Sequence, residues 1–172
     1  MAYLVIAIIV LLLLSLIVAG MYNNLVASKL KVDNSLTVLN KSIEKILNLV
    51  SNILNTSKKY LKYEQDIITK ISNTVKNYSS CDDLVKKSDA YALINNDLNS
   101  LFTLIEAYPE LKEDKNFIKD KQYFTDLENE CLKLTKIYNN DVQMYNNSVN
   151  SFPGNIVAKI FGFNKKDFFD IN

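Results

Sequence analysis

The sequence predicts an all-α fold: an N-terminal transmembrane helix, an antiparallel up-down-up-down four-helix bundle, and a short C-terminal helical tail. Three observations lead to this prediction. Residues 2–22 carry no charge, and Ser15 is the one clearly polar residue before the last of them. Between Gly20 and Pro153 the chain has no glycine and a single proline, Pro109, whereas a strand-rich domain needs many turn residues. Apolar residues in the body recur at steps of three and four, the spacing of one helix face.

The N-terminal run, residues 2–22, is predicted to be a retained single-span anchor. A helix rises ~1.5 Å per residue, so about 20 apolar residues cross a hydrocarbon core ~30 Å thick. A cleaved signal peptide would have basic residues ahead of a shorter apolar core and a small-residue cleavage site, and Val18-Ala19-Gly20 is a poor one. Lys29 and Lys31 follow the run and no lysine precedes it. This bias favours a single-pass protein with its N-terminus outside and its body in the cytoplasm.

The clearest apolar pattern in the body is a coiled-coil seam directly after the anchor. Its members step by three and four: Leu36, Leu39, Ile43, Ile46, Val50 and Ile53. If residues 22–79 formed one helix, the next helical segment, at about 83–108, would be less than half as long. The seam next to the anchor would then face water. Exposing six aliphatic side chains forfeits ~1.5–3 kcal/mol each, so the seam needs a partner. We therefore predict a break within 48–58, with a homodimer covering one long helix as the alternative.

With that break, the body at 23–152 divides into four helices. Their expected ranges are about 22–50, 52–79, 83–108 and 114–152. Asp82 or Asp83 is expected to cap the third helix and Asp114 the fourth, because a carboxylate at the N-cap accepts hydrogen bonds from first-turn amides. Pro109 separates the third helix from the fourth.

Residues 153–172 are expected to form a separate amphipathic, Phe-rich tail. Pro153 is predicted to end the last long helix, and Gly162 to stop a short following helix in the left-handed conformation. Two roles stay open: the tail caps the end of the bundle, or it lies among lipid headgroups with its lysines toward anionic lipid. The candidate membrane contacts are Lys159, Phe161, Phe163, Lys165, Lys166 and Phe168.

The composition argues against catalysis, metal binding and nucleic-acid binding. The net charge is +1, and all 20 basic residues are lysines, so a basic nucleic-acid surface is not expected. The chain has no histidine, which removes the commonest general base and metal ligand. Cys81 and Cys131 are too few for a four-thiolate zinc site, and we expect both to be free thiols. We expect no enzymatic activity and no cofactor.

Four short motifs occur in order along nearly the whole chain. They are Tyr22–Val26 (YNNLV); Glu106–Lys112 (EAYPELK) with Asn116-Phe117; the pairs Tyr138-Asn139 and Tyr145-Asn146; and Phe152-Pro153 with Gly162-Phe163. In these motifs the chain resembles the LemA family of bacterial membrane-anchored helical proteins. It departs from the family pattern at Ser51, where a proline is usual, and at Tyr63, where a histidine is usual. The resemblance implies a bacterial cell-membrane anchor with a cytoplasmic antiparallel helical bundle, and it implies no biochemical activity.

Two of these motifs supply candidate surfaces for a protein partner. The candidate residues are Glu106, Tyr108, Pro109, Lys112, Tyr138, Asn139, Tyr145 and Asn146. Each has a structural alternative: the first four would form a helix stop, and the tyrosines would belong to the core seam. We predict a non-catalytic scaffold or protein-interaction module at the inner membrane, with lipid and one or more unidentified proteins as partners and homo-oligomerisation left open. The alternative is a signal coupler whose transmembrane helix continues into the bundle.

Overall fold

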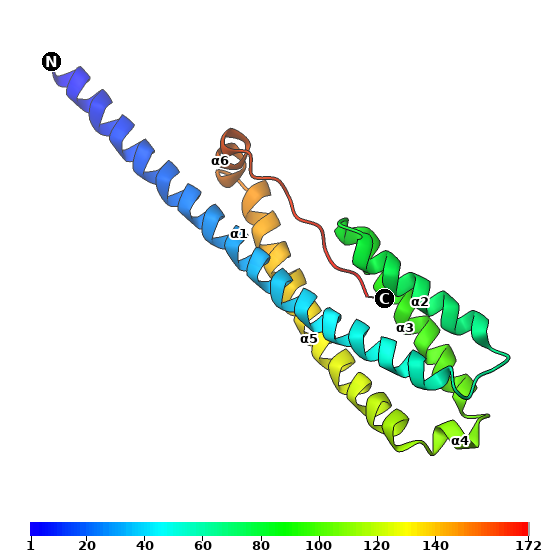
Figure 1. Ribbon diagram of the computed structural model, residues 1–172. Coiled ribbons are helices and arrows are strands. Elements are labelled where there is room, and N and C mark those ends of the chain that lie inside the picture. The colour runs from blue at the N-terminus through cyan, green and yellow to red at the C-terminus, as the bar shows by residue number, and fades with distance from the viewer. Residues whose placement is uncertain (172) are drawn as a thin grey trace. The chain divides into compact units, whose positions relative to one another are not determined.

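The computed structural model of the protein describes residues 1–171, and every regular element in that range is a helix (Figure 1). In chain order these are α1 (Ala2–Ser57), α2 (Gln65–Ser80), α3 (Leu84–Ile105), α4 (Pro109–Lys112), α5 (Lys115–Asn150) and α6 (Gly154–Phe161). The prediction of an all-α fold is confirmed. The chain divides into two compact units. The first comprises Met1–Leu36 and Tyr138–Lys166, and the second comprises Thr37–Ile137 and the chain from Asp167 onward.

The apolar run at the start of α1 has no covering element in the first unit (Figure 1). Residues 2–20 are all exposed, and an 18-residue window of this helix has a mean hydropathy of 3.2 with none of it buried. Within the described residues, α1 is the one helix long and apolar enough to cross a membrane. The helix then continues without interruption to Ser57. The apolar run therefore leads into the body without a linker.

The predicted break after the first body helix is displaced toward the C-terminus. α1 extends to Ser57 instead of ending near residue 50, and α2 begins at Gln65 instead of 52. The polar residues of 48–58 do not interrupt α1, since Ser51 donates its hydroxyl back to the Leu47 carbonyl at 3.0 Å and stays helical. The chain turns only where Leu61, which is fully buried, anchors the segment between α1 and α2. Residues 22–79 therefore form two helices.

The second unit buries the coiled-coil seam within a single copy of the chain. Five of the six seam residues are fully buried: Leu39, Ile43, Ile46, Val50 and Ile53, while Leu36 is half-buried. In α2, Ile68 and Ile71 are fully buried, and Ile67 is half-buried. A second copy is not needed to cover this seam.

Helices α2 and α3 lie side by side in the second unit, joined by a three-residue connection (Figure 1). Lys70 of α2 and Asp97 of α3 form an ion pair at 2.8 Å. On its other side α3 meets α5 through Phe102, whose ring lies edge-on to Phe117 and Phe124 at centroid distances of 6.2 and 5.7 Å. Packing of this kind buries most of an aromatic side chain and adds a favourable edge-to-face geometry.

The expected N-caps are confirmed at two helices. Asp83 accepts hydrogen bonds from the amides of Val85 and Lys86 at the start of α3, at 3.0 and 3.1 Å. Asp114 does the same for the amides of Asn116 and Phe117 at the start of α5, at 2.8 and 3.0 Å. Each carboxylate satisfies amides that have no partner inside their own helix.

The first unit brings α6 against the side of α1 and the end of α5. Buried Leu25, Val157 and Ala158 form a small core, and Met21, Val149 and Phe163 pack around it. Further along, Lys31 of α1 pairs with Asp141 of α5 at 2.9 Å.

The turn into α6 begins with Pro153 and Gly154. A Cβ on Gly154 would lie 2.3 Å from the Ser148 carbonyl oxygen, so glycine permits the close approach of α6 to α5. Gly162 ends α6 at φ 73°, as the sequence predicts for a left-handed cap, and its amide donates to the carbonyl of Ala158. Glycine adopts this conformation without the steric cost of a side chain.

Candidate functional site

The corner between α3 and α4 is the first candidate partner surface. Pro109 is the first residue of α4, and Leu111 is fully buried beneath it. Tyr108 is half-buried, whereas Glu106, Pro109 and Lys112 are exposed. The structure therefore assigns a packing role to part of this motif and leaves the rest at the surface.

Tyr60, Tyr108, Pro109 and Glu110 line a recess of about 410 Å³ at this corner. Tyr108 donates its hydroxyl to a carboxylate oxygen of Glu64, and Tyr60 donates to Asp114 at 3.0 Å. These hydrogen bonds to carboxylates, followed by burial, raise the pKa of each tyrosine. The amide of Phe117 and then the Tyr60 hydroxyl hold the pKa of Asp114 below its usual value. Both tyrosine rings are thus fixed beside carboxylates.

An ion-pair network occupies the outer side of the same corner. The Glu106 carboxylate lies 2.6 Å from the Lys112 ammonium and 3.6 Å from that of Lys121. The hydrogen bond from Lys112, together with its charge, lowers the pKa of Glu106, and the same contact raises the pKa of Lys112. Because these side chains are about half exposed, the network orients the surface more than it stabilises the fold.

The second candidate surface, the two Tyr-Asn pairs of α5, faces inward. Tyr138 and Tyr145 are each 1% exposed and belong to the core, as their structural alternative predicts. The Tyr145 hydroxyl donates to the Asn164 carbonyl at 2.9 Å. Burial, and then the charge of Asp33, raise the pKa of Tyr145. Asn139 is half-buried and interacts with other residues of the protein.

Asn146 of the second pair forms a two-bond clamp on the chain after α6. Its side-chain amide donates to the Lys166 carbonyl at 2.8 Å, and its side-chain oxygen accepts from the Lys166 amide at 2.9 Å. The Lys166 ammonium lies 3.0 Å from Asp33 of α1. This part of the motif therefore holds the tail in place.

The candidate membrane contacts fall into two groups. Lys166 faces protein, as described, and Phe163 is half-buried, with its ring 5.7 Å from that of Tyr22. The exposed members are Lys159, Phe161, Lys165 and Phe168. Phe161 also contacts Tyr22, at a centroid distance of 4.9 Å, while half of its surface stays exposed.

The last described residues contact α3 in the second unit. Phe169 is fully buried against Tyr91, and Ser88 exchanges hydrogen bonds with the backbone of Asp170. The tail therefore covers part of α3. This contact had no signal in the sequence, because the segment has no periodic pattern.

Both cysteines are free thiols. Cys131 is buried, and this burial raises the pKa of its thiol, while hydrogen bonds with Tyr91 and Thr135 act in the opposite direction. Cys81 is half-exposed between α2 and α3. Within residues 1–171 no three His, Cys, Asp or Glu side chains gather as a group that could hold a metal ion.

Three further residues contribute to the corner without any signal in the sequence: Tyr60, Glu64 and Lys121. Tyr60 lies in the turn between α1 and α2 and reaches Asp114, 54 positions away. Contacts between residues so distant in sequence leave no local pattern. A carboxylate near a tyrosine in a fixed turn is visible only in the folded chain.

None of the curated proteins matches the chain. A family model described as the LemA family matches residues 22–172, which begin where the apolar run of α1 ends. This match covers well over half of the chain and includes the α3–α4 corner, both Tyr-Asn pairs and the turn into α6. The protein is therefore a member of the LemA family.

Proposed function

We propose that this protein is a non-catalytic, membrane-anchored scaffold that presents a helical body to protein partners at the bacterial inner membrane. The observation that carries the proposal is the uncovered apolar run of α1. None of its most apolar 18 residues is buried, and Gly20, near its end, has no neighbour within 4 Å of an added Cβ. Each unburied aliphatic side chain would cost ~1.5–3 kcal/mol in water, so a hydrocarbon environment is the favourable one.

The body is proposed to be an antiparallel four-helix bundle of α1, α2, α3 and α5 in the cytoplasm. The order of contacts in the first unit supports this topology: Met21 of α1 and Val149 of α5 pack around the same small core, and ten residues later in α1, Lys31 pairs with the earlier Asp141 of α5. The short connection between α2 and α3 supports it as well. Lys29 and Lys31, directly after the apolar run, support the orientation with the N-terminus outside.

The proposed partner surface is the recess lined by Tyr60, Tyr108, Pro109 and Glu110. Aromatic rings beside carboxylates attract a lysine or arginine side chain through cation–π and ionic contacts. Here Glu64 and Asp114 hold the two hydroxyls, and Glu110 lies on the exposed rim. The partner would therefore offer a basic segment.

Site-specific photocrosslinking in cells tests this surface. A photoreactive residue in place of Glu110 is expected to give a discrete crosslinked product, whereas the same residue at Glu130, an exposed acid of α5, gives none. A Tyr108→Ala substitution removes one wall of the recess and should abolish the product while the helical circular dichroism persists. Equal products at the two positions would contradict the proposal.

The second candidate function is signal coupling, and the continuity of α1 favours it. One helix runs from Ala2 to Ser57, so a displacement of the apolar run would reach the body directly. An Asn24→Pro substitution interrupts the helix just after the run, with Asn24→Ala as its matched control. A scaffold would keep its crosslinked product in both variants. Loss of the product in the proline variant alone would favour the coupler.

A further inference from the structure

Helix α6 has more apolar surface than its packing uses. Viewed along the axis at 100° per residue, Gly154, Val157 and Ala158 form the buried arc against α1 and α5. Ile156 and Ile160, four positions apart, form a second arc, and they are 50% and 68% exposed. Asn155 and Lys159 lie on the remaining arc. The helix is therefore apolar on two sides and polar on the third.

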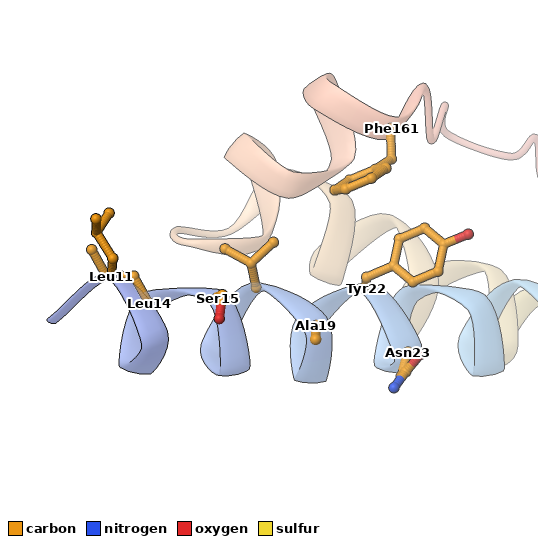
Figure 2. A pocket seen from close by; sticks show the side chains of 8 residues that line it. Leu11, Leu14, Ser15, Ala19, Tyr22, Asn23 and Phe161 are labelled. Carbon is orange, nitrogen blue, oxygen red and sulfur yellow. The ribbon is translucent and has the colours of Figure 1, made fainter. Parts of the chain in front are cut away.

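The end of α6 contacts α1 where the apolar run ends. Phe161, at the end of α6, contacts the ring of Tyr22, and together with Leu14 and Val18 they line an open apolar recess of about 540 Å³. Figure 2 shows Phe161 above α1 and near the ring of Tyr22. Leu11 and Leu14 lie nearer the N-terminus of the same run. The half-exposed Phe161 thus joins α6 to the run that is proposed to cross the membrane.

Phe152 extends this surface at the turn before α6. Its side chain is 79% exposed, and it contributes to a smaller recess with Met21, Leu25 and Pro153. Tyrosine and tryptophan are enriched where protein crosses from hydrocarbon to water, and Tyr22 lies at the end of the apolar run, with its ring against that of Phe161. Lys159, on the polar arc of α6, is placed to meet lipid phosphates.

We propose that α6 is a second membrane contact: it lies in the headgroup region with Ile156, Ile160 and Phe152 in the acyl boundary. The inference rests on the anchoring of α1 proposed above. An interfacial helix buries its apolar face about 5–10 Å into this boundary. Contact at this depth would fix both the height of α1 in the membrane and its rotation about its axis, because α6 is packed on one side of α1.

Tryptophan fluorescence in the full-length protein tests this inference, since the chain contains no tryptophan. Single variants Ile156→Trp and Ile160→Trp are placed in phosphatidylcholine vesicles that carry bromine either near the headgroup or deep in the acyl chains. Leu11→Trp reports on the anchor. Leu30→Trp is the matched aqueous control, because Leu30 is an exposed apolar residue of α1 about 18 Å of helix rise beyond Val18.

We expect the α6 variants to lose more fluorescence to shallow bromine than to deep bromine, and Leu11→Trp to show the reverse. Leu30→Trp should be quenched by aqueous iodide and by neither lipid. If Leu11→Trp is quenched by lipid while the α6 variants behave like Leu30→Trp, the inference is wrong and the anchor stands. If the α6 variants are shielded from both lipid and iodide, another protein surface covers α6, which also overturns the inference. If Leu11→Trp is not quenched by either lipid, the anchoring fails and the inference fails with it.

Discussion

Replacing Asn146 with alanine should release the chain segment around Lys166 from α5. The substitution removes two hydrogen bonds, of 2.8 and 2.9 Å, between the Asn146 side chain and the Lys166 backbone. A hydrogen bond contributes a net ~0.5–1.5 kcal/mol, so the pair contributes about 1–3 kcal/mol. At 1.4 kcal/mol per factor of ten, the docked segment should open about 5- to 140-fold more often.

Hydrogen–deuterium exchange at the Lys166 amide measures this opening, because the amide is protected through Asn146. The full-length Asn146→Ala variant should exchange faster at Lys166 by about the factor above. The amides inside α5 should change little. Asn147→Ala is the matched control, since Asn147 is the exposed next residue of the same helix. Unchanged exchange at Lys166, or an equal increase in both variants, would refute the clamp.

Three further predictions concern packing, pH and thiol chemistry. Gly154→Ala should lower the free energy of unfolding by about 1–3 kcal/mol, because its Cβ would meet a backbone carbonyl of α5 at 2.3 Å; Gly20→Ala, where an added Cβ meets nothing, is the control in thermal unfolding. The lowered pKa of Asp114 means that it stabilises the fold above its unfolded pKa of about 3.9 and loses this contribution as pH falls through the folded value. An Asp114→Asn variant should therefore lose less stability than the wild type in an acid titration of circular dichroism, and an identical acid profile would contradict the assignment. A thiol-specific maleimide at pH 8 should modify Cys81 well before Cys131, since burial both shields Cys131 and raises its pKa; equal rates in folded protein would contradict that burial.

The parts of the fold that follow from local chemistry could be predicted from the sequence. The predicted burial of the α1 seam is confirmed from Leu39 to Ile53. A 3-4 spacing places these residues on one helix face whatever the partner is. The predicted caps at Asp83 and Asp114 are confirmed, because a carboxylate just before a helix readily accepts hydrogen bonds from the free amides of the first turn. The prediction that Gly162 ends α6 in the left-handed conformation is also confirmed, because glycine adopts this conformation without steric cost.

The end of α1 could not be placed from the sequence. Ser51 and its polar neighbours are weak helix formers, yet serine hydroxyls can bond to the preceding turn, so they do not force an end. No glycine or proline marks the turn at 58–64. The position is set by the burial of Leu61, a tertiary contact, which overrides local propensity.

The candidate sites were predicted less well than the fold, for a physical reason. A tyrosine at helical spacing gives the same pattern in a core seam and in a partner surface, so Tyr138 and Tyr145 could be assigned only after their burial was known. The tail lacks periodicity, and its position depends on single long-range contacts such as Asn146 with Lys166 and Ser88 with Asp170. The recess at the α3–α4 corner likewise arises from segments far apart in the chain.

The sidedness of the protein in intact cells tests directly whether α1 anchors a cytoplasmic body. In a background with both native cysteines replaced by alanine, Ala2→Cys and Tyr63→Cys variants are treated with a membrane-impermeant maleimide. Tyr63 is 93% exposed, so its position is reactive whenever the reagent reaches it. If α1 spans the membrane with the body in the cytoplasm, residue 2 is labelled in intact cells and residue 63 only after lysis. Labelling of residue 63 in intact cells would contradict a body held in the cytoplasm by a membrane-spanning α1.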